Sequence, residues 1–133
     1  MTNVWIIVPT FCEVENLVPL LERIEPAVAA CDPPVDATVL IVDDASPDGT
    51  GALAGALART RPWLQLLHRE GKGGLAGAYV AGFHRALAAG ADLVVQLDAD
   101  LSHDPADIFE RPRSRSRKTI GTSATVRPAA TAS

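Results

Sequence analysis

The chain has 133 residues, 47% of them hydrophobic, and its 16 acidic and 12 basic residues give a formal net charge of −4. This length allows one domain or part of a larger one. The longest apolar runs are far shorter than the roughly 18 residues that a membrane-spanning helix needs, so no transmembrane segment is expected.

The first apolar run follows a start without basic residues and stops at Pro9. A cleavable secretory signal is therefore not expected, and we predict a cytoplasmic location. Cys12 and Cys31 lie in neither a Cys-x-x-Cys nor a zinc-binding spacing, so we expect both to be reduced, semi-buried thiols.

Four short apolar segments have the composition of β-strands. Each is almost continuously apolar, which is typical of strands covered on both faces, as in a parallel sheet. These segments are Val4–Val8, Val39–Val42, Trp63–Leu67 and Leu93–Leu97.

The segments between these strands have helical periodicity. Apolar residues recur at steps of three and four between Leu17 and Val28, and Pro26 is expected to end or kink this helix. Thr50 is the expected N-cap of a short second helix that reaches Ala58.

The third expected helix runs from Ala76 to Ala89 and stops at Gly90. Its periodicity places Ala76, Val80, Phe83 and Leu87 on the buried side. Two glycines inside it, Gly77 and Gly82, are unfavourable by helix propensity and indicate close packing on a neighbour.

This alternation of strands and helices predicts an α/β fold, an open parallel sheet with helices on both faces. Ligands of such sheets bind beyond the carboxyl ends of the strands. The four segments at these ends all carry charge. They are Pro9–Glu13, Asp43–Thr50, His68–Gly74 and Asp98–Asp104.

Asp98-Ala99-Asp100 is the most informative of these segments. If the segment is extended, residues two apart point the same way, so the two carboxylates converge and a hard cation such as Mg²⁺ or Mn²⁺ would relieve their repulsion. Alternatively, the aspartates only start the loop and cap a helix entered at Pro105. Ser102 and His103 could extend the metal site or shape the turn.

The segment that starts with Asp43-Asp44 also has two interpretations. Pro47-Asp48-Gly49 is typical of a tight turn. An acid at the end of a strand is also where such folds bind the ribose hydroxyls or base donors of a nucleotide. The two interpretations are compatible.

Two further segments offer ligand contacts. Gly71–Gly74 precedes the third helix, so its amides, together with Lys72 and Arg69, could bind a diphosphate, although a flexible connection is the simpler interpretation. Phe11 could pack on a base or sugar and Glu13 could accept from base donors, although this segment could also be only a strand exit.

Taken together, the four segments resemble the family-2 glycosyltransferases, and most closely the dolichol-phosphate (polyprenol-phosphate) mannosyltransferases. The resemblance covers residues 4 to 110 and is most specific in Asp43–Thr50 and in the Asp98–His103 segment. It implies the nucleotide-sugar-binding half of a Rossmann-like GT-A domain over residues 1–110. Phe11-Cys12 replaces a usual Tyr-Asn, and Ala45 and Ala76 each replace a usual glycine.

The resemblance implies mannose transfer from GDP-mannose to a polyprenyl (dolichyl) phosphate at the membrane surface by an inverting enzyme. It implies peripheral attachment to the membrane, with a membrane-anchored partner subunit or domain as one option, and no nucleic acid. Asp98 and Asp100 would be the catalytic pair and hold Mg²⁺ or Mn²⁺. The nucleotide-sugar-binding residues would be Pro9, Phe11, Glu13, Val42, Asp44, Lys72, Asp98, Ala99 and Asp100.

The charge is divided unevenly along the chain. Residues 1–110 hold all 16 acidic and six basic residues, a net −10, whereas residues 111–133 hold six basic and no acidic residues. We expect this basic, Ser/Thr/Ala-rich tail to be disordered, the enzyme to be truncated after Glu110, and its activity to be impaired. The alternatives are a family-2 transferase with another donor such as UDP-glucose, or a non-catalytic nucleotide-binding module.

Overall fold

The computed structural model describes residues 1–71, 74–102, 105 and 123–126. The strands form one sheet in the order β3-β2-β1-β4-β5, in which β1 to β4 are parallel. The predicted alternation of strands and helices and the parallel sheet are confirmed. In chain order the elements are β1 (Thr2–Thr10), α1 (Leu17–Ala29), β2 (Val35–Asp43), α2 (Thr50–Ala58), β3 (Leu64–His68), α3 (Gly74–Ala88), β4 (Leu93–Gln96) and β5 (Ser123–Val126).

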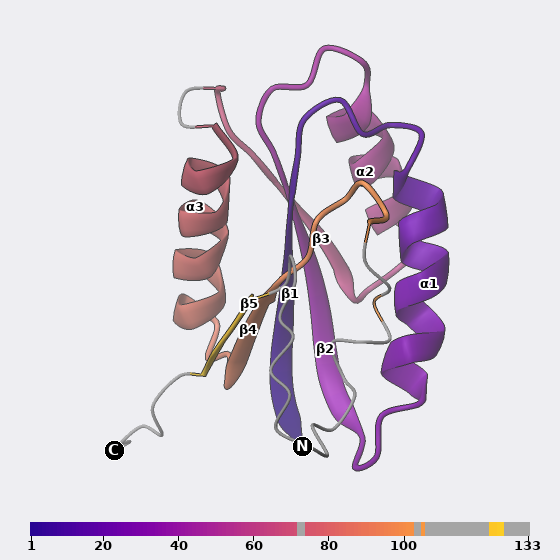
Figure 1. The fold of residues 1–133 in the computed structure, drawn as a ribbon, viewed down its shortest axis with the longest axis vertical. Coiled ribbons are helices and arrows are strands. Elements are labelled where there is room, and N and C mark those ends of the chain that lie inside the picture. Colours follow the sequence, from indigo (N-terminus) through magenta and orange to yellow (C-terminus); the bar gives the residue numbers. More distant parts are fainter. Residues whose placement is uncertain (72–73, 103–104, 106–122, 127–133) are drawn as a thin grey trace.

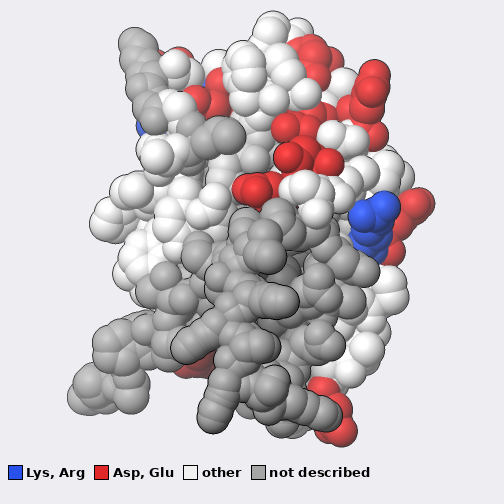
Figure 2. Space-filling view, viewed as in Figure 1, with Lys and Arg blue, Asp and Glu red and all other residues white. Residues whose placement is uncertain are grey.

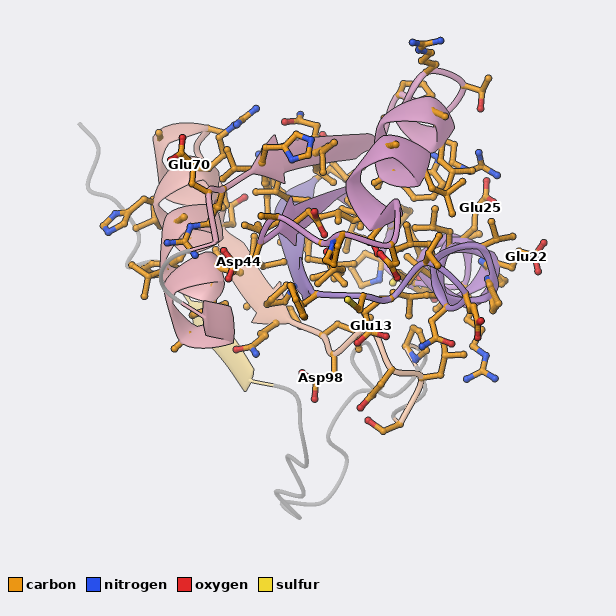
Figure 3. All side chains as sticks on the ribbon, turned by 90° about the horizontal axis from the view of Figure 1, so that it is seen from above. Glu13, Glu22, Glu25, Asp44, Glu70 and Asp98 are labelled. Carbon is orange, nitrogen blue, oxygen red and sulfur yellow. The ribbon has the colours of Figure 1, made fainter. Side chains whose placement is uncertain are left out.

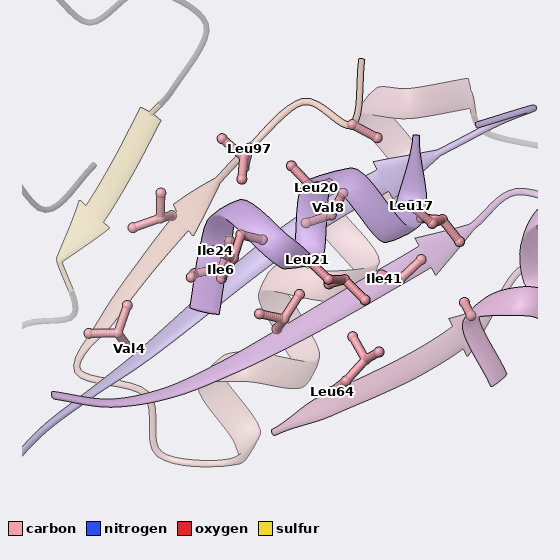
Figure 4. Packing of buried hydrophobic residues seen from close by; sticks show 14 residues of the cluster. Val4, Ile6, Val8, Leu17, Leu20, Leu21, Ile24, Ile41, Leu64 and Leu97 are labelled. Carbon is pink, nitrogen blue, oxygen red and sulfur yellow. The ribbon is translucent and has the colours of Figure 1, made fainter. Parts of the chain in front are cut away.

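The sheet lies between two layers of helices, with α1 and α2 on one face and α3 on the other (Figure 1). Val4, Ile6 and Val8 of β1 belong to the buried cluster beneath α1 and α2, part of which is drawn in Figure 4. Trp5 and Ile7 belong to a second cluster beneath α3. Because both faces of β1 are covered, its sequence is apolar without alternation.

α1 buries the predicted leucine-rich face and continues through Pro26 to Ala29. Of the two outcomes expected at Pro26, an end or a kink, the helix therefore does not end there. A proline leaves the carbonyl four residues earlier without its helical partner. That carbonyl belongs to Glu22, and both residues are exposed, so water can replace the missing donor.

α2 ends at Ala58 as predicted, but its N-cap is Gly49 and Thr50 is its first helical residue. Gly49 has φ 94°, a left-handed conformation that glycine adopts without steric cost. The Thr50 side chain is consequently available for contacts outside its own helix.

α3 packs on the sheet through small residues, so the predicted face is partly wrong. Ala76 is exposed and Val80 is 50% exposed, whereas Phe83 and Leu87 are half-buried. At Gly82 an added Cβ would lie 2.6 Å from Cγ2 of Ile7 and 3.0 Å from Cγ2 of Val42, which confirms the predicted close approach. The residues of α3 that are buried against the sheet are Ala78, Gly82 and Ala86.

β5 pairs antiparallel with β4, with Ser123 opposite Gln96 and Val126 opposite Leu93. The structure therefore differs from the expectation of a disordered tail at residues 123–126. The rest of residues 111–133 lies outside the described residues, so the predicted boundary after residue 110 stays a prediction. In the part of the chain that the structure describes, no helix combines the length and the apolarity needed to cross a membrane.

Candidate functional site

The carboxyl ends of the central strands meet at one edge of the sheet. Thr10 at the end of β1 is the register partner of Asp43 in β2, and Ile7 accepts a hydrogen bond from the amide of Leu97, just after β4 (3.0 Å). Acidic side chains gather in the upper part of the face shown in Figure 2, the end at which β1 and β2 finish in Figure 1. Seen from above, Glu13, Asp44 and Asp98 project from this edge, while Glu22 and Glu25 lie on α1 (Figure 3).

Asp43 is a buried structural carboxylate. It is 1% exposed and accepts hydrogen bonds from Oγ1 of Thr10 (2.8 Å), from the amide of Ser46 (3.0 Å) and from Oγ of Ser46 (2.6 Å). Three donors satisfy its charge away from water. Asp43 therefore ties the end of β1 to the loop that follows β2.

Asp44 is paired with Arg69. Its Oδ1 lies 3.1 Å from Nη1 of Arg69, and the carboxylate is 6% exposed. The Arg69 guanidinium also lies against α3, since a Cβ at Gly77 would be 3.2 Å from its Nη2. The sequence pattern allows Arg69 as a diphosphate ligand beside Lys72, but in the structure its guanidinium pairs with Asp44. Lys72 lies outside the described residues.

Phe11 and Glu13 follow β1 directly, on a loop with an accessible aromatic ring. Phe11 is 50% exposed, and Glu13 is half-buried with its Oε1 accepting from Nδ2 of Asn16 (2.8 Å). Between them, Cys12 has φ 58°. A base or sugar can reach the Phe11 ring, as the sequence interpretation requires.

Pro9 and Val42 are register partners and both are buried. Val42 belongs to the cluster beneath α3 and faces Gly82. Neither side chain is exposed to a ligand at the edge. Any contribution of these two residues to binding comes from their backbone or from the support that they give to the loops above.

The loop after β2 is bonded to the loop after β1 through three side chains. The amides of Cys12, Glu13 and Val14 donate to Ser46 Oγ (2.9 Å), Thr50 Oγ1 (3.0 Å) and Asp48 Oδ2 (3.3 Å), respectively. The pKa of Asp48 is lowered, chiefly by the hydrogen bond from the Thr50 hydroxyl and further by bonds from the amides of Thr50 and Val14.

Cys12 lies in the loop after β1, where its amide donates to Ser46. The pKa of its thiol is raised, first by partial loss of water around it and then by the negative charges of Asp48 and Asp43. Cys12 and Cys31 are both free, as the sequence predicted, but Cys12 is exposed whereas only Cys31 is half-buried as expected. A raised pKa keeps Cys12 in the weakly reactive thiol form at neutral pH.

Asp98, Ala99 and Asp100 form a turn, not the extended segment that sequence reasoning assumed. β4 ends at Gln96, and Leu101 has φ 65°. Ala99 is buried in the core beneath α1, while Asp98 is half-buried and Asp100 is exposed. Insertion of the Ala99 methyl into the core turns the chain, so a spacing of two no longer implies parallel side chains.

Asp100 also stabilises this turn, because its Oδ1 accepts from the amide of Ser102 (3.0 Å). His103 lies outside the described residues. Within the described ranges, no group of three or more His, Cys, Asp or Glu side chains is arranged to hold a metal ion. Asp98 and Asp100 are the carboxylates of this turn, and a cation from solution can reach both.

Thr10, Ser46 and Thr50 also build this edge, a role that the sequence interpretation does not include. Ser46 had a detectable signal, because Asp43 and Ser46 stand three apart and a short polar side chain often bonds the nearby backbone in a turn. Thr10 gave no such signal. Its partner Asp43 is 33 residues away and is identified only by the register of β1 and β2.

A sheet of four parallel strands with helices on both faces and charged loops at its carboxyl edge defines an open α/β protein, a class in which ligands bind at that edge. The model of glycosyl transferase family 2 matches residues 5–110, so the chain belongs to this family.

Curated relatives and a solved structure resemble the same region. The chain is 47% identical over 102 residues to an undecaprenyl-phosphate mannosyltransferase from Micrococcus luteus, covering 77% of this chain and 40% of the relative. It is 45% identical over 104 residues to a polyprenol monophosphomannose synthase from Mycolicibacterium smegmatis, covering 77% and 37%. A mannosyltransferase from Pyrobaculum calidifontis, solved with GDP-mannose and Mn²⁺, superposes with a TM-score of 0.62 at 31% identity, covering 73% and 27%. The chain thus spans well under half the length of these proteins.

Proposed function

We propose that this chain binds GDP-mannose at the carboxyl edge of its sheet and forms the donor half of a polyprenol-phosphate mannosyltransferase. The acceptor would be a polyprenyl or dolichyl phosphate at the membrane surface, with the enzyme attached peripherally. The proposal rests chiefly on one observation: the family match over residues 5–110 includes every described charged loop of this edge. The names of the curated relatives support mannose as the sugar.

Each predicted donor-binding residue would act according to its exposure. The exposed ring of Phe11 would stack on the base or sugar. Glu13 would accept a hydrogen bond from a base or ribose donor. For Asp44, which is 6% exposed and paired with Arg69 through Oδ1, the other carboxylate oxygen would be the acceptor. Pro9 and Val42, which are buried, would support these groups from below.

Asp98 and Asp100 would hold Mg²⁺ or Mn²⁺, and the residues fit such an ion. Two accessible carboxylates suit a hard cation that takes its remaining ligands from substrate phosphates and water. When bound, the ion would offset the charge that develops on the departing diphosphate. Ala99, buried between the two acids, would fix the turn, and Lys72 would add a positive charge near the diphosphate.

Calorimetric titration of GDP, with and without Mn²⁺, tests donor binding. We expect binding that depends on Mn²⁺ and that Asp98→Asn and Asp100→Asn each weaken. Asp36→Asn is the matched control, because Asp36 is an exposed acid at the opposite, amino end of β2. Binding that is independent of the metal, or equal in all three variants, would refute the metal site. Tighter binding of UDP than of GDP would favour a different donor.

Transfer is tested separately with radiolabelled GDP-mannose and a polyprenyl phosphate in detergent. Formation of radiolabelled lipid product by the wild type, and its loss in Asp98→Asn, would support the complete reaction. Metal-dependent GDP binding without transfer would limit the role of this chain to donor binding.

A further inference from the structure

We propose that Ser46, Asp48 and Thr50 are positioning residues for the nucleotide: together they fix the backbone that presents Phe11 and Glu13. We call these three side chains the loop clamp. The inference rests on the proposed function, because it assumes that Phe11 and Glu13 face the donor.

Each of the three side chains of the loop clamp accepts a hydrogen bond from the loop after β1. Three consecutive amides, those of Cys12, Glu13 and Val14, donate to three different side chains of one five-residue segment. These amides lie between the end of β1 at Thr10 and the start of α1 at Leu17. The clamp therefore holds a stretch that belongs to neither regular element.

The acceptors of the clamp are themselves held in place. Oγ of Ser46 donates to the buried carboxylate of Asp43 (2.6 Å), and the hydroxyl of Thr50 donates to Oδ1 of Asp48. Thr50 is fully buried as the first residue of α2. The three acceptors are thus anchored to β2 and α2, so the loop after β1 is fixed to the rigid part of the fold.

Such anchoring matters for a ligand because ordering a loop on binding lowers the affinity. Cys12 is held with φ 58°, a conformation that most residues avoid. Without the bond from its amide to Ser46, this residue would relax, and Phe11 and Glu13 on either side would change direction. Loss of one hydrogen bond that preorganises the loop should weaken GDP binding by about three- to tenfold.

The test compares Ser46→Ala and Thr50→Val, which remove a hydroxyl, with Thr50→Ser, which keeps it. Thr60→Val is the control, since Thr60 is an exposed threonine at the other end of α2 whose hydroxyl donates to Leu57. Amide hydrogen exchange of the unliganded protein, measured by NMR, reports the clamp directly. We expect faster exchange at Cys12 in Ser46→Ala and at Glu13 in Thr50→Val.

Calorimetry on the same proteins reports the effect on the donor. We expect Ser46→Ala and Thr50→Val to bind GDP about three- to tenfold more weakly in the presence of Mn²⁺, and Thr50→Ser to bind like the wild type. The ratio of affinities with and without Mn²⁺ should not change, because the clamp does not include Asp98 or Asp100. If Thr50→Val bound GDP weakly only because its fold was disturbed, Thr50→Ser would not restore the affinity with the ratio unchanged.

The outcomes separate the two proposals. If the wild type binds GDP and the two hydroxyl-deletion variants bind equally well, the positioning role is refuted and the proposed function stands. If the wild type does not bind GDP at all, the proposed function is refuted and the positioning role with it. Unchanged amide exchange in a folded Thr50→Val would refute the clamp without reference to any ligand.

Discussion

Ala45 is held in an unfavourable backbone conformation, so its replacement by glycine should stabilise the protein. Ala45 follows Asp44 with φ 58°, a left-handed conformation that costs an L-residue with a Cβ about 1–2 kcal/mol. Glycine avoids this cost but loses about 0.5–1 kcal/mol more backbone entropy on folding. The difference predicts that Ala45→Gly raises the free energy of unfolding by about 0.5–1 kcal/mol.

Urea denaturation followed by far-UV circular dichroism measures this difference, with the m-value as a check that the unfolded state is unchanged. The control is Ala56→Gly, the same substitution at an exposed position inside α2, where it should lower stability by about 1 kcal/mol. The two variants should therefore move the urea midpoint in opposite directions. A destabilised Ala45→Gly would show that Ala45 does not adopt the left-handed backbone conformation.

Three further predictions concern packing, the ion pair and pH. Gly82→Ala should destabilise the fold by about 1 kcal/mol or more through overpacking. Gly55→Ala in α2 should stabilise it, because the added Cβ would lie 3.6 Å from the nearest side-chain atom. Equal urea midpoints of the two variants would contradict this prediction. Arg69→Met should cost about 1–3 kcal/mol by leaving the buried Asp44 carboxylate unpaired, and much less in an Asp44→Asn background, as a double-mutant cycle would show. Because the pKa of Asp48 is lowered on folding, its stabilisation is present above its unfolded pKa of about 3.8 and is lost as pH falls through the folded value. Asp48→Asn should therefore flatten the acid limb of a curve of stability against pH. An unchanged acid limb would argue against the hydrogen bonds that Asp48 accepts from Thr50 and Val14.

The sequence was sufficient for the architecture because the apolar strands and the helical faces are local patterns. Val4–Val8 is apolar throughout, and both of its faces are buried. The errors arose where tertiary packing overrides local preference. Val80 satisfies the periodicity of α3 but is half-exposed, since the helix approaches the sheet at Gly82 and presents its small residues.

The site was predictable only in part, for a related reason. The position of the acids at strand ends follows from topology, so the collection of Asp44, Glu13 and Asp98 at one edge could be predicted. The partners of each acid depend on atoms distant in the sequence. Arg69 follows a different strand, 25 residues after Asp44, and no local pattern distinguishes an arginine that binds a carboxylate from one that binds a diphosphate.

The departures from the family resemblance gain a physical meaning from the structure. The chain carries Cys12 and Ala45 at positions where the resemblance has asparagine and glycine, and both have φ 58°. Asparagine and glycine are the residues that adopt this conformation most readily. The two substitutions therefore place strain in the two loops that the clamp joins, in addition to any lost contact with the donor.

The partners of the acids at this edge also decide which variants can test function. Asp43 is satisfied by three donors inside the protein, so Asp43→Asn would disturb the link between β1 and β2 and reduce binding through the fold. Asp98 and Asp100 are accessible to solvent, on a turn anchored by the buried Ala99. Replacing either by asparagine, which at position 100 keeps the Oδ1 that accepts from the amide of Ser102, should leave the urea midpoint almost unchanged. A loss of Mn²⁺-dependent GDP binding in these variants can then be assigned to the lost carboxylate, whereas the same loss in Asp43→Asn cannot.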